Sequence, residues 1–296
     1  MSTYRFIETA REFSAYRGQL EQRHVGIVAL DLEAEFNLHV YGEHFCLLQI
    51  HDGTEAVLVD PQAVPVEAIG AFLEDRDILK ITYDSAGDRG LLFRNHGIRM
   101  RSLLDLRPAV DLLNYEKQGL SSVLESALGH TPGPGKKRYQ QYNWMRRPID
   151  PGAVEYAIGD VLHLFELKDH LLEELRRGGL LERYILENLK VQDQDPETGR
   201  KAGFLRTGRF RKLPRPRQEH LEEIHAVRER YARELNLPPN SVLPNGALFE
   251  IVQGSQDLES LRPARGVPRG TFEAMLREIR ERGRISGEGG ASGSRS

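Results

Sequence analysis

The chain has little of what marks secreted or membrane proteins. Only one of its 296 residues is cysteine, which excludes a disulfide framework, and Cys46 stands in an apolar run that predicts a small core residue. Residues 1–5 contain no apolar signal core, and no run reaches the roughly 18 apolar residues of a membrane span. These absences predict a protein of the reducing cytoplasm with no membrane partner.

Charge is unevenly distributed along the chain. Residues 199–296 hold 19 Lys and Arg against 12 Asp and Glu, a balance of +7, so the net charge of −3 leaves −10 for residues 1–198. The densest stretch, residues 200–217, carries eight basic residues and no acid. It suits either a solvated linker or a segment that binds phosphates, because Lys and Arg displace counterions from a polyanion.

Carboxylates in three separate segments predict a metal site. Asp31 and Glu33 end the apolar run 25–33, which suits a buried strand, and alternation puts both on one face. Tyr156 and Asp160 lie four apart in a helical pattern and share one helix face. Together with Asp88 they supply oxygen ligands of the kind that two divalent cations about 4 Å apart require. Each piece alone also fits a solvated strand end or helix face.

Three motifs and an aromatic signature together resemble one family. The first motif is residues 28–35 (VALDLEAE), the second 81–88 (ITYDSAGD) and the third 156–161 (YAIGDV). Residues 144–149 (WMRRPI) precede the third and are similar to the family signature Trp-x-x-Arg-Pro-Leu. By these motifs the chain resembles ribonuclease D, in the tyrosine-bearing branch of the DEDD superfamily of 3'-5' exonucleases, over roughly residues 4–190.

The resemblance implies a fold, a reaction and cofactors. The fold is α/β, an RNase H-like mixed sheet flanked by helices. The reaction is hydrolysis of RNA from its single-stranded 3' end to nucleoside 5'-monophosphates, with tRNA precursors as the implied substrate. Two divalent ions, Mg²⁺ or Mn²⁺, would be held by Asp31, Glu33, Asp88 and Asp160, with Tyr156 orienting the attacking water. A DNA or short-oligonucleotide exonuclease would use the same site, and a non-catalytic nucleic-acid adaptor is the alternative of another class. The intact acids argue against the adaptor.

Several further residues are candidates for substrate contact or support. Lys136, Lys137 and Arg138 precede a run of aromatic residues, a mixture typical of single-strand binding, in which cations hold phosphates and rings stack on bases. Tyr83 stands where relatives of this family often carry a substrate-contacting His. The other supporting residues are expected to be structural: Trp144 as a clamp for the Tyr156 helix, Asp105 as a helix cap, and Glu35 as a solvated acid or one beside the ligands.

The sequence predicts four segments. Residues 1–191 form the exonuclease domain, 192–217 a basic linker, 218–285 a small all-α domain and 286–296 a disordered Gly/Ser-rich tail. Runs 233–239 and 243–248 make the third segment similar to the HRDC domain, which is associated with nucleic-acid binding. In the first segment a capping box at Thr9 and Glu12 predicts a helix to residue 22, followed by strands at 25–33, 45–50, 56–59 and 78–82.

Overall fold

The computed structural model describes residues 4–130, 136–194 and 203–288, without the side chains of residues 136, 137, 204 and 283–288. The chain divides into two compact units. Unit 1 comprises Met1–Glu35 and Glu43–Thr198, and unit 2 comprises Phe36–Gly42 and Gly199–Ser296.

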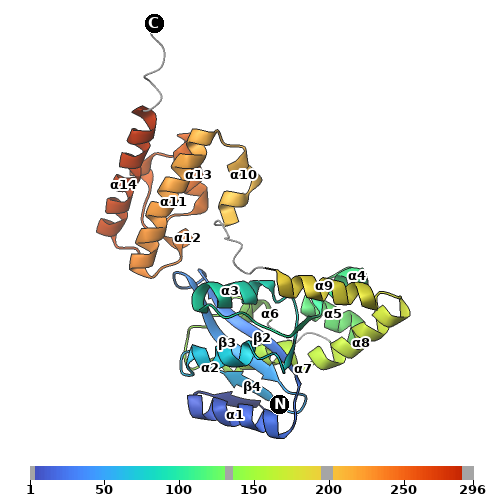
Figure 1. The fold of residues 1–296 in the computed structure, drawn as a ribbon. Coiled ribbons are helices and arrows are strands. Elements are labelled where there is room, and N and C mark those ends of the chain that lie inside the picture. Colours follow the sequence, from blue (N-terminus) through green and yellow to red (C-terminus); the bar gives the residue numbers. More distant parts are fainter. Residues whose placement is uncertain (1–3, 131–135, 195–202, 289–296) are drawn as a thin grey trace. The chain divides into compact units, whose positions relative to one another are not determined.

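Unit 1 is built on a mixed six-stranded sheet with the strand order β1-β4-β3-β2-β5-β6 (Figure 1). β3 runs antiparallel to β4, whereas the pairs β1 with β4, β2 with β5 and β5 with β6 are parallel. The strands are β1 (Tyr4–Ile7), β2 (Ile27–Phe36), β3 (Glu43–His51), β4 (Ala56–Val59), β5 (Leu79–Thr82) and β6 (Leu103–Asp105). The mixed sheet is as predicted. The edge strands β1 and β6 were not expected, because four and three residues are too few to show a period.

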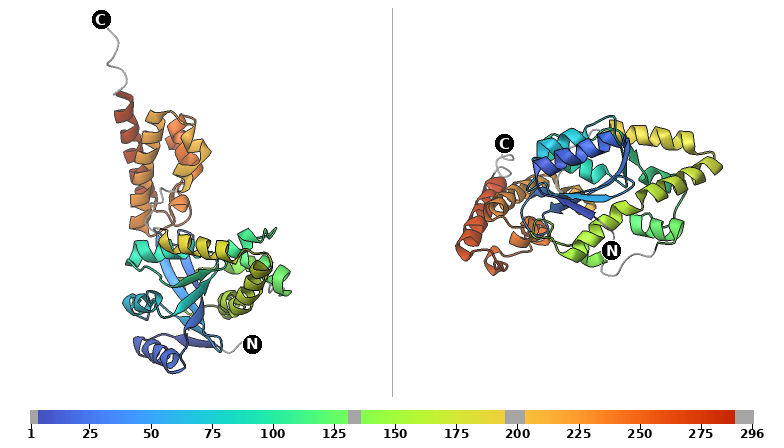
Figure 2. Two further views of the ribbon diagram at one scale, coloured as in Figure 1. Left: turned by 45° about the vertical axis from the view of Figure 1, so that its right-hand side comes forward. Right: turned by 90° about the horizontal axis from the view of Figure 1, so that it is seen from below.

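Helices cover both faces of this sheet. One face packs against α1 (Ala10–Gln22), α2 (Val66–Leu73) and α3 (Ala86–His96). Figure 2 shows the blue helix α1 on one side of the strands and a long yellow-green helix on the other. The remaining helices of unit 1 contribute to the apolar clusters of the second face, and they are α4 (Arg107–Leu112), α5 (Leu120–Leu128), α6 (Lys136–Tyr139), α7 (Pro151–Leu162), the yellow-green α8 (Leu164–Arg177) and α9 (Leu181–Asp193). The predicted start of α1 is confirmed, since the Thr9 hydroxyl accepts from the Glu12 amide at 3.2 Å, and the Glu12 carboxylate in return accepts from the Glu8 amide at 3.1 Å.

Strand β2 shows how this layering places the acids. Val28, Leu30 and Leu32 belong to the core beneath α1, α2 and α3, whereas Ala29 belongs to the core beneath α4, α5 and α8. Because side chains alternate along a strand, Asp31 and Glu33 share the second face.

Unit 2 is an all-α bundle around a single apolar core. Its elements are η1 (Gly203–Arg206), α10 (Gly208–Arg211), α11 (Arg215–Leu235), α12 (Pro239–Val242), α13 (Asn245–Gln253), η2 (Leu258–Ser260) and α14 (Arg269–Glu288). The segment predicted as a linker needs correction, because Leu205, Phe210 and Leu213 are buried in this core. Apolar residues spaced among the basic ones draw the chain into the bundle before residue 218. The predicted disordered tail 286–296 is corrected at its start, because residues 286–288 belong to α14, and residues 289–296 lie outside the described residues.

Within the described ranges, no helix has both the length and the apolar character that crossing a membrane requires.

Candidate active site

Three carboxylates from two elements converge on the second face of the sheet. Asp31 and Glu33 lie on β2 beyond its last paired residue with β5, Ala29 opposite Ile81, and Asp160 lies on α7. One carboxylate oxygen from each of the three lies within 4.8 Å of the others. We call Asp31, Glu33 and Asp160 the acid cluster. Three of the four predicted metal ligands are thus brought together.

The acid cluster is electrostatically crowded. The pKa of Glu33 is raised well above its ordinary value, first by burial and then by the charges of Asp31, Asp160 and Asp88. Half-buried carboxylates this close repel one another, and a bound cation would remove that repulsion. Oxygen-only donors of this kind match hard divalent cations such as Mg²⁺ and Mn²⁺. The donor set therefore fits the metal that the motifs implied.

Asp88 lies on the first turn of α3, outside the group of oxygens within 4.8 Å. Its carboxylate is still near enough to influence Glu33. Burial, followed by the charges of Asp84 and Asp105, raises the pKa of Asp88 to about 7. Direct contact with the same ion as the acid cluster would need a side-chain movement or a bridging water.

Tyr156 lies one helical turn before Asp160 on α7. Its pKa is raised above 10, first by burial, then by the charges of Asp160 and Glu33, and then by its hydrogen bond to Asp160. The phenol therefore stays protonated at neutral pH. Its ring packs near two others, with centroid distances of 6.0 Å to Tyr139 and 6.4 Å to Trp144.

A buried ion pair fixes the segment that leads into α7. The Arg147 guanidinium donates to both carboxylate oxygens of Asp60 at 2.6 and 2.7 Å, to the Cys46 carbonyl at 2.7 Å and to the Trp144 carbonyl at 2.8 Å. Asp60 follows β4 and Cys46 lies in β3, so these bonds hold the loop against the sheet. Trp144, only 2% exposed, shares an apolar cluster with Cys46. The packing supports the clamp expected of Trp144 and the core position expected of Cys46.

Asp105 fixes the turn that leads into α3 and thus to Asp88. Its carboxylate accepts from the amides of Asp84 (2.9 Å), Ser85 (2.8 Å) and Arg107 (2.9 Å), and from the Ser85 hydroxyl (2.8 Å). Asp84 has φ 58°, a left-handed conformation that needs local support in a residue with a side chain. Only the bond to Arg107, the first residue of α4, corresponds to the expected helix cap. Three of the four bonds serve the α3 turn instead.

Asn188 holds Asp105 from the other side. Its side-chain oxygen accepts from the Asp105 amide at 2.8 Å, and its amide nitrogen donates to the Asp105 carbonyl at 3.2 Å. Asn188 lies on α9 and is 5% exposed. The turn before Asp88 is therefore tied through Asp105 to a helix 83 residues further along the chain.

The predicted substrate-contact residues have contacts of their own, outside the hydrogen bonds just described. The Tyr83 hydroxyl donates to the Gln118 carbonyl, and the ring is half-buried. Arg138 is exposed, with its guanidinium 5.5 Å from the Tyr139 ring centroid. Lys136 and Lys137 belong to α6, but their side chains lie outside the described part of the chain. Glu35 is only 1% exposed, so the expectation of a solvated side chain is wrong. The alternative, that Glu35 lies beside the metal ligands, stays a prediction.

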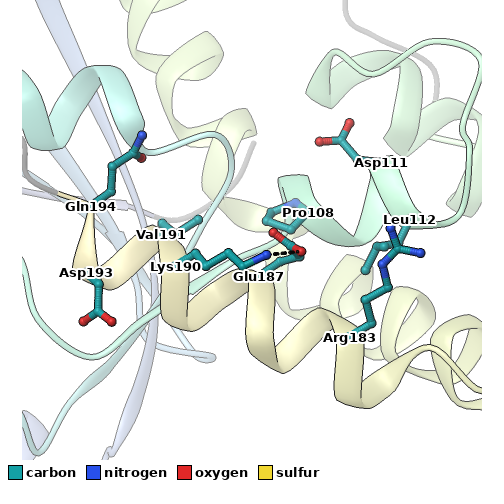
Figure 3. Close-up of a pocket in the computed structure, with 9 residues that line it drawn as sticks. All are labelled: Pro108, Asp111, Leu112, Arg183, Glu187, Lys190, Val191, Asp193 and Gln194. Atoms are coloured by element: carbon teal, nitrogen blue, oxygen red, sulfur yellow. Dashed lines mark hydrogen bonds and ion pairs between the residues drawn. The ribbon is translucent and has the colours of Figure 1, made fainter.

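A pocket of about 730 Å³ lies elsewhere in unit 1, between α4 and α9 (Figure 3). It mixes charges of both signs, and Lys190 and Glu187 on its wall form an ion pair of 2.8 Å. No predicted site residue lines it. Its lining residues are Pro108, Asp111, Leu112, Arg183, Glu187, Lys190, Val191, Asp193 and Gln194.

The residues that hold the site in place carry no motif in the sequence. Arg147 stands there only as part of the signature, and no pattern predicts a role for Asp60 or Asn188. The available signals were weak. Asp60 directly follows a buried strand and Arg147 directly precedes a proline, but neither position names its partner.

Comparison with known proteins places this geometry in a family. Residues 4–176 match the sequence model of the 3'-5' exonuclease family, and residues 217–281 match that of the HRDC domain. Ribonuclease D of Gluconacetobacter diazotrophicus is 28% identical over 256 residues, which cover 82% of this chain. The chain spans only 63% of the length of that curated relative.

Solved structures share the fold at low identity. The catalytic core of RRP6 from Trypanosoma brucei superimposes with a TM-score of 0.76 at 20% identity, covering 96% of this chain and 81% of that one. Escherichia coli RNase D gives a TM-score of 0.71 at 21% identity, covering 95% and 75%. The exonuclease model alone matches more than half of the chain. The chain therefore belongs to the 3'-5' exonuclease family, and the resemblance to ribonuclease D inferred from its motifs is confirmed.

Proposed function

We propose that this chain is a metal-dependent 3'-5' exoribonuclease that releases nucleoside 5'-monophosphates from RNA, with tRNA 3' ends among its substrates. The observation that carries the proposal is the acid cluster, in which carboxylate oxygens of Asp31, Glu33 and Asp160 lie within 4.8 Å of one another. An adaptor that only bound nucleic acid would gain nothing from three crowded carboxylates, because they repel phosphates.

The acid cluster would hold one Mg²⁺ or Mn²⁺ ion, and Asp88 with Asp31 would hold a second. Bound divalent ions supply a water of lowered pKa and charge stabilisation of the leaving 3' oxygen. The position of Asp88 outside the 4.8 Å group supports a looser, water-mediated hold on the second ion.

The remaining residues would bind and orient. Tyr156 keeps its proton at neutral pH, so its hydroxyl can hold the attacking water by a hydrogen bond and is unsuited to act as a base. Trp144 and Tyr139, whose rings pack near it, restrict the position of the ring. Because the hydroxyl of Tyr83 is engaged with a backbone carbonyl, contact of this residue with RNA would come from its ring.

Strand polarity follows from the resemblance to ribonuclease D, and charge would decide which 3' ends are accepted. A free 3'-hydroxyl can approach the acids, whereas a 3'-phosphate would bring two further negative charges against Glu33 and Asp88. Digestion should therefore begin at a 3'-hydroxyl and proceed one nucleotide at a time.

The test compares labelled single-stranded RNA, single-stranded DNA, a dinucleotide and pre-tRNA, each with and without Mn²⁺. We expect RNA with a free 3'-hydroxyl to be shortened stepwise only with metal, and Asp31→Asn to lose this activity while it keeps its thermal unfolding transition. Degradation of circular RNA as fast as linear RNA would show an endonuclease. Faster turnover of DNA or of the dinucleotide than of RNA would favour the other nuclease reading. Full activity in Asp31→Asn would remove the acid cluster from the mechanism.

A further inference from the structure

A second group of metal-ligand side chains lies on unit 1, and the proposed nuclease activity makes no use of it. His130, His163 and Glu166 each offer one ligand atom, and the three atoms lie within 4.8 Å of one another. His130 Nε2 is 3.1 Å and His163 Nδ1 is 3.9 Å from the same oxygen, Glu166 Oε2. We call these three residues the histidine cluster.

The local structure explains why these side chains meet. Helix α5 ends at Gly129 in the left-handed conformation with φ 73°, and the His130 amide donates back to the Leu124 carbonyl at 3.2 Å. That C-terminal turn fixes the direction of the chain at His130. His163 lies at the junction of α7 and α8, and Glu166 follows in the first turn of α8. The buried Leu164 and Leu167 hold this junction in the core beneath the sheet.

The donor set differs in kind from the acid cluster. Two imidazole nitrogens and one carboxylate oxygen form the set that borderline transition metals prefer, whereas Mg²⁺ and Ca²⁺ prefer oxygen alone. In a tetrahedral zinc site with bonds near 2.0–2.2 Å, neighbouring ligand atoms are about 3.4 Å apart. The observed 3.1 and 3.9 Å lie on either side of that value.

The two imidazole rings must rotate out of their stacked arrangement to reach one ion. They are stacked, with centroids 3.9 Å apart and planes inclined by 29°, so their nitrogen lone pairs do not yet meet at a point. The side chains of His130 and His163 are each 37% exposed and that of Glu166 is 59% exposed, which leaves room for the movement and access for an ion.

A third imidazole interacts with one member of the group. His51, at the end of β3, interacts electrostatically with His163, and its ring packs edge-on against Phe165 at 5.7 Å. Its Nδ1 is buried without a hydrogen-bond partner among the described residues. Buried polar atoms are normally paired, so this nitrogen, in an imidazole that interacts with His163, is consistent with a further ligand at the site.

We propose that His130, His163 and Glu166 bind one Zn²⁺ ion, or another borderline transition metal, at a site separate from the acid cluster and with a coordination position open to water or to His51. The ion would tie the end of α5 to the junction that follows the helix carrying Tyr156 and Asp160. The site would thus have a structural role and would discriminate against Mg²⁺, the ion suited to the acid cluster.

The experiment measures Zn²⁺ binding to the metal-free full-length protein by calorimetry, with Mg²⁺ in large excess to occupy oxygen sites. Co²⁺ in place of Zn²⁺ gives an absorption spectrum that reports nitrogen ligands. We expect one equivalent of Zn²⁺ to bind, and Asp31→Asn to retain it. His130→Ala and Glu166→Gln should each weaken binding by more than the 10- to 100-fold typical of losing a residue that only supports a ligand.

The chain offers a matched control on α8. His170 Nε2 is 3.6 Å from Glu174 Oε2, which makes a second exposed His–Glu pair, and neither residue belongs to a described metal-ligand group. His170→Ala should leave Zn²⁺ affinity unchanged, and thermal unfolding of His130→Ala should match that of the metal-free parent. Absence of Zn²⁺ binding under excess Mg²⁺, equal loss in His170→Ala and His130→Ala, or loss in Asp31→Asn alone would each overturn the proposal.

Discussion

Replacing Asp105 tests whether a buried carboxylate supports the α3 turn and, through it, Asp88. Four donors lie 2.8–2.9 Å from its two oxygens, and the residue is 3% exposed. A hydrogen bond to a charged group contributes about 1.5–3 kcal/mol, but four bonds on one carboxylate are not additive, and single substitutions rarely cost more than about 4–5 kcal/mol. We therefore expect Asp105→Ala to lower the free energy of unfolding by about 4 kcal/mol.

Asp105→Asn should cost about half as much, because the amide keeps one acceptor oxygen and turns an NH₂ group toward two donors. It should also weaken Mn²⁺ binding, since the start of α3 would shift. Asp111→Asn is the control: this 51% exposed acid pairs with Arg107 at 3.1 Å, and such exposed pairs contribute about 0.2–1 kcal/mol. Urea denaturation and Mn²⁺ calorimetry measure both effects. Equal stability losses in the Asp105→Asn and Asp111→Asn variants would refute the stability argument, and unchanged Mn²⁺ affinity in Asp105→Asn would refute the link to Asp88.

Three further predictions concern the acid cluster and its support. Tyr156→Phe should lower kcat on RNA but change Mn²⁺ affinity by less than about threefold, because the substitution removes only a hydroxyl. Loss of Mn²⁺ binding in calorimetry would contradict the orienting role. The pKa of Asp88 is about 7 in the folded protein and 3.8 in its ordinary state. The metal-free protein therefore loses folding stability as the pH rises from about 4 to about 7, because Asp88 must then be ionised in a buried site. Mn²⁺ should accordingly raise Tm more at about pH 8 than at about pH 5, and an equal rise at both would reject this account. Arg147→Lys should lower the free energy of unfolding, measured by urea denaturation, by about 2–4 kcal/mol, because lysine cannot bond both oxygens of the buried Asp60. A loss below about 1 kcal/mol would mean that this pair does not secure the loop.

Features that depend only on neighbouring residues could be predicted from the sequence. The run that ends in Asp31 and Glu33 is a strand because its apolar residues are continuous, and alternation then orients both acids. Tyr156 and Asp160 share a helix face for the equally local reason of their spacing. The α1 cap follows from Thr9 and Glu12 in the same way. These elements needed no knowledge of distant partners.

The contacts that complete the site could not be read from the sequence, because they join residues far apart in the chain. Arg147 and Asp60 are separated by 87 positions, and Asn188 and Asp105 by 83. Pairing of buried polar groups depends on which elements the fold brings together, and any of several acids could have served Arg147. The histidine cluster is similar: His130 and Glu166 are 36 positions apart and lie at the ends of different helices.

The acids of the candidate site cannot hold their own arrangement. Asp31, Glu33 and Asp160 repel one another, and burial makes that repulsion stronger, so something else in the fold must resist their separation. The structure supplies that resistance in paired polar groups with low exposure: Arg147 with Asp60 secures the approach to α7, and Asp105 with Asn188 secures the approach to α3. The first pair holds the loop that precedes α7, the second holds the turn that precedes α3 through Asp105, and neither pair belongs to the acid cluster. A substitution at these pairs should therefore change metal affinity without removing a ligand, an effect that a reading of the catalytic motifs alone would not anticipate.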